Sequence, residues 1–429
     1  MTKRLAIPSS VLVRNTVLAT GWQGIRVALQ AVWVVLLARA VGPGDYGSFA
    51  GMAGLAAAMG SLTGLGFGML MVQDASRDRG HFSIAWKRAF QMTLASGIGL
   101  WAIYMVVAPL LFRTHMGLWS YAAIGLPELI CFPITIVAAY AFQLHERMGW
   151  AGALFTLITI GNLIAVTAFL LAAPAKALAF YLPFHAAGSI LAAGCAVAFV
   201  IRLLAPSSAA FSLTRRDMRE GFGFSLMRIA DTGMTSLDKT LVLLLAGPQV
   251  AGIYSSAYRL VAVLAMPATS LGMAALPRLF RTHHAKPGEP ARKPDFVALL
   301  LAATAAYGVI AAVLAYLLSG VLPILFGTAF EQAAQAARWL AISPLLYGVY
   351  ALGCNVLVTS HRRTLRILAQ AAGIVILVAS AWLWVPKFGL KGAVGMLLFT
   401  QCATALLLWL LVRWSRDRGE PHADSEAAS

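Results

Sequence analysis

Apolar stretches long enough to cross a membrane follow one another along almost the whole chain, and they constrain its fold more than any other feature. A bilayer core about 30 Å thick asks for roughly 20 largely apolar residues per helix. We predict twelve such segments, at residues 14–38, 48–73, 87–112, 118–142, 150–172, 178–203, 222–246, 252–276, 296–325, 334–359, 367–385 and 391–414. With 60% hydrophobic and 11% charged residues and a mean hydropathy of +0.79, the composition is that of an all-α membrane protein.

The connections between these segments leave little room for chemistry. The longest, at residues 205–220 and 278–295, are shorter than the roughly 50 residues that a soluble catalytic domain needs. No paired cysteine motif, H-E-x-x-H spacing, Ser-His-Asp arrangement or glycine-rich phosphate loop occurs. We therefore predict a protein that is not an enzyme and has no metal or cofactor. His185 is the one histidine expected to be buried, in a structural role.

Basic residues predict the orientation, because Lys and Arg near helix ends stay on the cytoplasmic side during insertion. With the amino terminus inside, 22 of them fall in or beside the cytoplasmic connections and five on the opposite side. Both termini are therefore expected in the cytoplasm. The formal charge of +17 arises from these regularly spaced groups, whereas a nucleic-acid binder would gather them on one folded face. We predict no nucleic-acid partner.

One short turn motif occurs twice in the sequence. "VGPGDYGSF" occupies residues 41–49, "AGPQVAGIY" occupies residues 246–254, and 205 positions separate Gly42 from Gly247. Proline stops a helix and glycine permits a tight reversal. Each turn joins the first two helices of a six-helix half, so we predict two parallel pseudo-repeated lobes around a central cavity, an architecture of transporters. Their predicted bounds are 1–205 and 206–414, with a disordered cytoplasmic tail at 415–429.

The repeat also aligns charges that lie deep in the helices. A shift of 205 positions places Arg26 opposite Asp231, and a charge at such depth costs about 2.5 to 3.5 kcal/mol unless it faces a partner or water. Polar residues recur at helical spacing in three segments; these are Gln23, Arg26 and Gln30, then Arg228, Asp231, Thr235, Asp238 and Lys239, and then Tyr254, Tyr258 and Arg259.

Two explanations remain open for these charges. They could pair with one another and hold helices together, as Arg228 with Asp231. Alternatively they line a water-filled cavity, in which cations outnumber anions and suit an anionic substrate, since arginine offers a fixed fork to phosphate oxygens. On this hypothesis the substrate-binding residues are Arg26, Arg228, Lys239, Arg259, Gln23, Gln30, Tyr254 and Tyr258. Asp231 and Asp238 are the candidates for coupling or gating.

Three stretches carry a family resemblance. "LLARAVGPGDYGSFAGMAGLAAAMGSLTGLGFGMLMVQDASR", "SLDKTLVLLLAGPQVAGIYSSAYRLVAVLAMPATSLGMAALPRLF" and "KFGLKGAVGM" resemble the first and second, the seventh and eighth, and the last helices of Wzx-type polysaccharide flippases. These O-antigen and exopolysaccharide flippases form part of the polysaccharide transporter branch of the MOP superfamily. The resemblance extends over the whole chain in length and helix number, although its motifs are diffuse.

The resemblance implies a multi-pass protein of the bacterial inner membrane. Its substrate would be an undecaprenyl-pyrophosphate-linked oligosaccharide, turned from the cytoplasmic to the periplasmic leaflet by alternating access for surface polysaccharide assembly. Membrane lipid would be a partner, and proton or sodium coupling and a polysaccharide synthesis complex stay open. Two alternatives remain: another MOP-superfamily exporter, of drugs, organic ions or a lipid II-like substrate, and a membrane-embedded polymerase or ligase.

Overall fold

The computed structural model describes residues 9–77, 79–112, 116–173, 175–207, 214–283, 296–360 and 362–417, and every regular element in these ranges is helical. The longer helices are α1 (Ser9–Gly60), α2 (Phe67–Arg77), α3 (Phe82–Phe112), α4 (Leu118–Leu126), α5 (Phe132–Leu144), α6 (Met148–Ala172), α7 (Leu178–Leu204), α8 (Arg215–His283), α9 (Phe296–Leu318), α11 (Glu331–Trp339), α12 (Ser343–Thr359) and α13 (Arg363–Asp417). Short turns of helix complete the order: η1 (Arg79–His81), η2 (Pro127–Cys131, a π turn), η3 (Ser319–Val321), α10 (Leu322–Phe326), η4 (Thr328–Phe330) and η5 (Leu340–Ile342).

The predicted all-α membrane fold is confirmed. Within the described residues, nine helical stretches are long and apolar enough to cross a membrane. Three of these contain a glycine with non-helical backbone angles, namely Gly42 in α1, Gly247 in α8 and Gly389 in α13. Every predicted segment except the second runs through helix without a break. Each of these three long helices is therefore divided into two arms, and each arm corresponds to a different predicted segment.

Two of the divided helices fold back on themselves. The rings of Trp33 and Phe49 lie 6.2 Å apart in α1, although 16 residues of straight helix would separate them by about 24 Å. Trp384 and Phe399 show the same reversal in α13, with ring centroids 5.2 Å apart. The polypeptide therefore makes a tight helical hairpin at each of these turns.

The repeated Gly-Pro motif has the same backbone conformation in both copies. Gly42 has φ 80° and ψ 172°, and Gly247 has φ 82° and ψ 177°. This region is accessible to glycine almost alone, because a Cβ atom would clash with the backbone. Equal angles produce equal bends, so the turn predicted from the sequence is present twice.

The second predicted segment, residues 48–73, is wrong in its middle. Helix α1 ends at Gly60, residues 61–66 form a turn, and α2 begins at Phe67. Gly64, Leu65 and Gly66 all have positive φ angles, which a helix cannot contain. Hydropathy hides this break because the turn contains two leucines and no charged residue.

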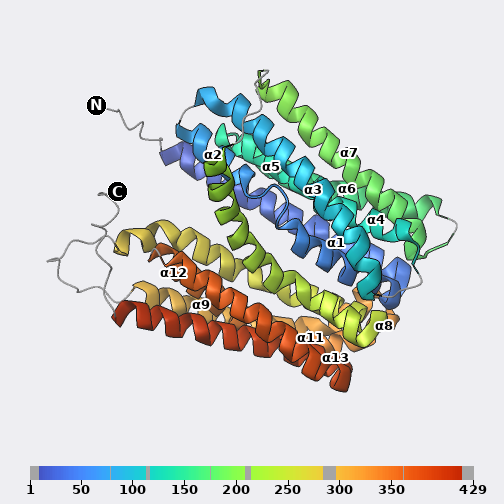
Figure 1. Ribbon diagram of the computed structural model, residues 1–429. Helices are drawn as coiled ribbons and strands as arrows, with labels where there is room; N and C mark the ends of the chain where they lie inside the picture. The colour runs from blue at the N-terminus through green and yellow to red at the C-terminus, as the bar shows by residue number, and fades with distance from the viewer. Residues whose placement is uncertain are drawn as a thin grey trace. The chain divides into compact units, whose positions relative to one another are not determined.

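The chain forms two compact units, which we describe separately. The first comprises Met1–Gly252 with Leu325–Ala329, and the second comprises Ile253–Ile324 with Phe330–Ser429. In the first unit α6 lies beside α1, α5 and α7, as Figure 1 shows, and Phe67, Trp86, Phe142 and Leu154 pack in its apolar core. In the second unit α12 packs against both α9 and α13.

The two Gly-Pro motifs touch each other within the first unit. A Cβ atom on Gly47 would collide with the carbonyl oxygen of Pro248, and one on Gly252 would collide with that of Pro43. These two contacts are related by the 205-residue shift, so each copy of the motif presents its glycine to the other copy's proline. The Thr240 hydroxyl also donates a hydrogen bond to the Gly51 carbonyl oxygen at 2.9 Å. The first arm of α8 is thereby held against the second arm of α1.

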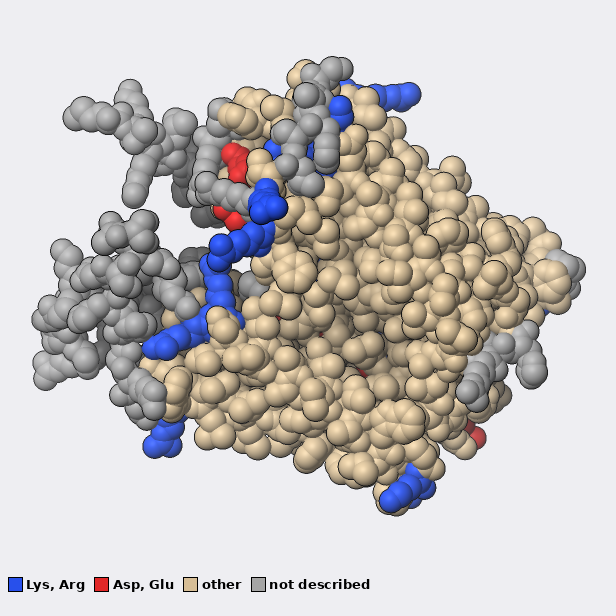
Figure 2. All heavy atoms as spheres, in the orientation of Figure 1, with Lys and Arg blue, Asp and Glu red and all other residues tan. Residues whose placement is uncertain are grey.

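Large apolar side chains cover the outside of the helices. Leu171 is 83% exposed, Leu110 73% and Ile324 72%. Figure 2 shows a face with Lys and Arg at its margins and a broad uncharged area between them. Such a surface suits the hydrocarbon core of a bilayer, which makes this a multi-pass membrane protein.

Candidate functional site

A pocket with an apolar lining and a few polar groups opens in the first unit between the first arm of α1, the end of α5 and the start of α6. Its cavity volume is about 190 Å³. A cavity that holds one water molecule measures roughly 10–15 Å³, so this pocket has room for a headgroup-sized ligand. The residues that line it are Trp22, Gln23, Arg26, Gln143, Met148, Ala151, Gly152, Phe155 and Thr156.

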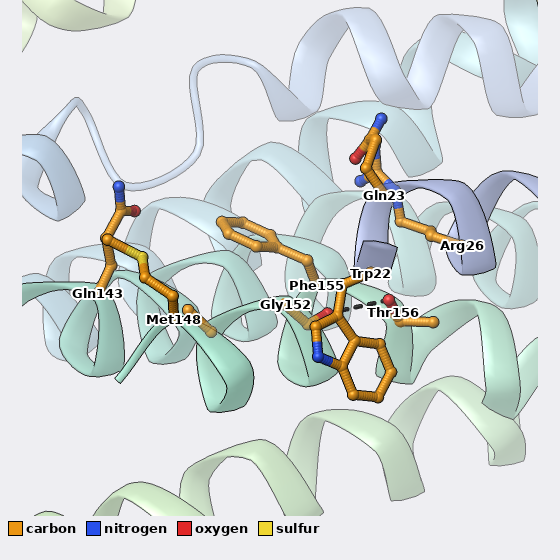
Figure 3. Close-up of a pocket in the computed structure, with 9 residues that line it drawn as sticks. Trp22, Gln23, Arg26, Gln143, Met148, Gly152, Phe155 and Thr156 are labelled. Carbon is orange, nitrogen blue, oxygen red and sulfur yellow. Dashed lines mark hydrogen bonds between the residues drawn. The ribbon is translucent and has the colours of Figure 1, made fainter. Parts of the chain in front are cut away.

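Arg26 supplies the charge of the pocket. Figure 3 shows its guanidinium beside the amide of Gln23, both carried by α1. The Arg26 side chain is half-buried, and its Nε atom is fully covered yet has no hydrogen-bond partner among the described residues. A buried polar group left unsatisfied costs about 1–3 kcal/mol, and more when it is charged. Arg26 therefore lines the pocket as a cation, while its covered Nε atom does not itself reach the cavity.

No acidic residue is among the described residues that line this pocket, so no carboxylate of the lining neutralises Arg26. Two amides add neutral donors and acceptors: Gln23 from α1 and Gln143 from the last turn of α5, both exposed. Figure 3 places Gln143 and Met148 across from Arg26, with the ring of Phe155 between them. The pocket can bind an anionic ligand that also carries hydroxyl groups.

The position of Trp22 in the pocket lining depends on Gly152. The Trp22 side chain packs so closely on α6 that a Cβ atom on Gly152 would lie 2.5 Å from its Cγ and Cδ1 atoms. Thr156, one turn later, donates its hydroxyl to the Gly152 carbonyl oxygen at 2.9 Å. Gly152 thus lets Trp22 lie against the α6 backbone and leaves the cavity free.

The structure joins two of the predicted binding residues, Gln23 and Arg26, in this one pocket. Gln30 lies one helical turn farther along α1 and is half-buried, but it does not line the cavity.

Lys239 and Asp238 are bound to each other in the first arm of α8. The Lys239 ammonium donates to the Asp238 carboxylate at 2.9 Å and to the Thr235 carbonyl oxygen, also at 2.9 Å. Asp238 is fully buried. The charge of Lys239 is therefore already balanced by its neighbour in the sequence. Internal pairing, one of the two explanations left open above, thus occurs here, but between Lys239 and Asp238 rather than between Arg228 and Asp231.

The other predicted residues of this arm are more accessible. Arg228 is half-buried and Asp231 is exposed, and the backbone carbonyl of Asp231 accepts a hydrogen bond from Thr235 at 3.2 Å. In the second unit, Tyr254 is buried and stacks on Tyr258, with ring centroids 6.3 Å apart, and Arg259 is half-buried one residue later.

Sequence reasoning did not find the α5 and α6 side of the pocket. Gln143, Gly152, Phe155 and Thr156 have no unusual spacing and lie in segments that read as ordinary apolar helix. The one available signal was Gln143, an amide one residue before the end of a membrane segment. Only the packing of α6 against α1 shows that these residues face Arg26.

His185 is buried, as predicted, in an aromatic cluster. The Trp33 indole Nε1 donates to the Tyr181 hydroxyl at 2.9 Å, and this hydroxyl lies 3.3 Å from His185 Nδ1. His185 stacks on Trp33 and meets the edge of Phe49. The cluster joins α7 to both arms of α1, so the histidine has a structural role.

Comparison with solved structures shows which fold this is. A multidrug resistance MATE family transporter of the MOP superfamily in an inward-facing conformation matches with a TM-score of 0.66 and 14% identity, over 93% of this chain and 98% of that one. The MATE multidrug transporter DinF-BH matches with a TM-score of 0.67 and 15% identity, over 97% and 98%. A MOP superfamily transporter from Pyrococcus furiosus, described by a reverse polarity of its binding pocket, matches with a TM-score of 0.57 and 15% identity, over 95% and 94%.

The fold is thus that of the MOP superfamily, the class to which the sequence resemblance pointed. No curated protein sequence matches the chain. Residues 12–283, more than half of the chain, match the family described as "Polysaccharide biosynthesis protein", and the chain belongs to this family.

Proposed function

We propose that the protein is a flippase that moves an undecaprenyl-pyrophosphate-linked oligosaccharide from the cytoplasmic to the periplasmic leaflet of the bacterial inner membrane. The observation that carries the proposal is Arg26, a half-buried arginine in a pocket whose described lining has no acid. A lipid pyrophosphate is anionic and must cross a layer that excludes it. A cationic pocket lowers that barrier while the polyprenyl tail stays in lipid.

The position of the pocket agrees with a substrate taken up from the cytoplasm. Gln143 and Met148 flank the connection at residues 145–147, which the distribution of basic residues assigns to the cytoplasmic side. On this assignment both termini are cytoplasmic and the Gly42 and Gly247 turns lie at the periplasmic side. A substrate made in the cytoplasm would meet the pocket first.

The remaining predicted residues have a role in the later part of transport. We propose that the lobes at residues 1–205 and 206–414 open alternately, and that Gln30, Arg228, Lys239, Tyr254, Tyr258 and Arg259 line the path of the headgroup beyond the pocket. Asp231 and Asp238 are proposed to gate or couple the movement, by proton or sodium. A polysaccharide synthesis complex would deliver the substrate and receive the product.

Drug export is the second candidate function, because two of the structural matches are multidrug transporters by description. A pocket for organic cations needs carboxylates, and the lining of the described pocket contains arginine and amides instead. The polysaccharide family match also favours a glycan substrate over a drug. A polymerase or ligase would need catalytic groups outside the bundle, for which the described connections are too short.

The test is complementation of a bacterial strain that lacks a known flippase, with surface polysaccharide and accumulated lipid-linked sugar as the two readouts. We expect the chain to restore export and the Arg26→Ala variant to abolish it at a normal level of inserted protein. Arg26→Lys keeps the charge without the fork and should retain only part of the activity.

Arg202→Ala is the matched control, because it removes one exposed arginine of the same unit far along α7 and should leave export intact. Full export by Arg26→Ala would rule out the cationic-pocket mechanism. Restoration of drug resistance without restoration of polysaccharide would establish the second candidate instead.

A further inference from the structure

The pocket around Arg26 has more polar groups than an anion site requires. One arginine fork satisfies two phosphate oxygens. The pocket adds the amides of Gln23 and Gln143 and the aromatic faces of Trp22 and Phe155, none of which a bare phosphate needs. We infer that this pocket is a subsite for the sugar attached to the phosphate, and that it sets which first sugar the protein accepts. The inference rests on the proposed function and makes it more specific.

The chemistry of a hexose 1-phosphate fits these groups. A sugar ring carries hydroxyl groups around its edge, and each hydroxyl both donates and accepts hydrogen bonds. An amide side chain also does both, whereas an ammonium or carboxylate does only one. With Arg26 on the phosphate, Gln23 beside it and Gln143 across the cavity can hold the edge of the ring from two sides.

The faces of the sugar ring carry C–H groups, which pack favourably against aromatic rings. Trp22 and Phe155 are both half-buried at the pocket, so each leaves part of its surface open to the cavity. About 190 Å³ of space accommodates a single sugar, and the rest of an oligosaccharide would extend outside. The pocket is therefore expected to recognise the sugar next to the phosphate rather than the whole glycan.

Gly152 controls the width of this subsite. A methyl group at residue 152 would overlap the Cβ, Cγ and Cδ1 atoms of Trp22, so Trp22 and the α1 backbone that carries it would have to move away from α6. Arg26 lies one turn after Trp22 on the same helix, α1, and would move with it. Gly152→Ala is therefore expected to weaken phosphate binding and sugar recognition together, whereas Gln143→Leu leaves Arg26 in place.

The experiment measures binding to the purified full-length protein in lipid nanodiscs by calorimetry. The probes are the 1-phosphates of glucose, galactose and N-acetylglucosamine, with inorganic phosphate, glycerol 3-phosphate and the free sugars for comparison. We expect at least one sugar phosphate to bind ten-fold or more tightly than inorganic phosphate and glycerol 3-phosphate. Gln143→Leu should reduce this preference to less than three-fold, and Gly152→Ala should weaken the binding of all the phosphate probes.

Gly149→Ala is the matched control on the same helix, because a Cβ atom there meets only Leu18, at 4.0 Å, and the preference should persist. Gln143→Leu, an exposed position, keeps the test valid if Gly152→Ala does not fold. Equal binding of inorganic phosphate, glycerol 3-phosphate and every sugar phosphate would overturn the sugar subsite, and so would an unchanged preference in the Gln143→Leu variant. Either result, combined with normal complementation by the wild-type chain, would leave the flippase function in place.

Discussion

Buried polar side chains join α1 to α7. Tyr181 is fully buried and joins Trp33 to His185 through its hydroxyl. The hydroxyl accepts from the indole, which leaves its own proton available to His185 Nδ1. One oxygen atom thus satisfies two buried groups from two helices.

Replacing Tyr181 by Phe removes that oxygen and keeps the ring. We expect a loss of about 1–3 kcal/mol in the free energy of unfolding, because the Trp33 N–H is left buried without an acceptor. The measurement is the thermal unfolding midpoint of the purified protein. Tyr140→Phe is the control, since no hydrogen bond of its hydroxyl occurs among the described residues, and it should change little. Equal midpoints for both variants would show that the Tyr181 hydroxyl contributes nothing to stability.

Variants of the ion pair between Asp238 and Lys239 can distinguish a structural role of Asp238 from a role in coupling. Asp238→Asn leaves the Lys239 ammonium without its counter-ion at a site only 13% exposed, so we expect lower stability together with loss of export. The double variant Asp238→Asn with Lys239→Gln removes both charges and should recover stability. If Asp238 couples transport, export stays absent in the double variant. Recovered export would reduce the pair to a structural contact.

At the scale of elements, the reversals at Gly42 and Gly247 depend on a backbone conformation that other residues rarely adopt. A Cβ atom would meet no neighbouring atom within 4 Å at either glycine, so crowding is not the constraint. The φ angles near 80° are what exclude other residues.

Gly42→Ala and Gly247→Ala should each lower the free energy of unfolding by about 1–3 kcal/mol through backbone strain. Gly99→Ala is the control, because Gly99 is an exposed helical glycine with equally free surroundings, and there alanine should be neutral or stabilising by up to about 1 kcal/mol. Chemical unfolding followed by tryptophan fluorescence measures all three variants. The same small effect at all three positions would contradict the strain argument.

At the scale of the whole molecule, the pairing of the two Gly-Pro motifs offers a way to lock the protein. Gly44 in α1 and Gln249 in α8 face each other, with the Gln249 Oε1 atom 3.6 Å from where a Gly44 Cβ would lie. The side chain of residue 249 reaches residue 44, so cysteines placed at these two positions can be tested for disulfide formation by oxidation. If the proposed lobes separate here during transport, that bond will stop the cycle.

We expect the variant with Gly44→Cys and Gln249→Cys to export polysaccharide under reducing conditions and to lose export on oxidation, with recovery after reductant is added. The four native cysteines, which are not disulfide-bonded, are first replaced by serine. Each single-cysteine variant is the control and should be insensitive to oxidant. Export that continues with a complete cross-link would show that these helices do not separate.

The sequence by itself determined the membrane fold, the extent of most helices, the two Gly-Pro turns and the presence of a charge, Arg26, within an apolar segment. These features are local: hydropathy over 20 residues, a proline after a glycine, and one charge in an apolar segment. The turn at residues 61–66 was missed because two leucines and the absence of charged residues keep the hydropathy of the segment high. Chain reversals at glycine could be predicted because they need a specific residue type.

Tertiary structure alone decided which residues surround Arg26 and which charges are already paired. Gln143, Gly152 and Phe155 face Arg26 because α6 packs on α1 along one particular side, and helical periodicity does not specify the partner of a face. Lys239 is adjacent to Asp238 in the sequence, yet only the side-chain conformation brings their charged groups to 2.9 Å. Contacts between distant segments depend on the packing of the whole unit, and that information does not reside in any single stretch of the chain.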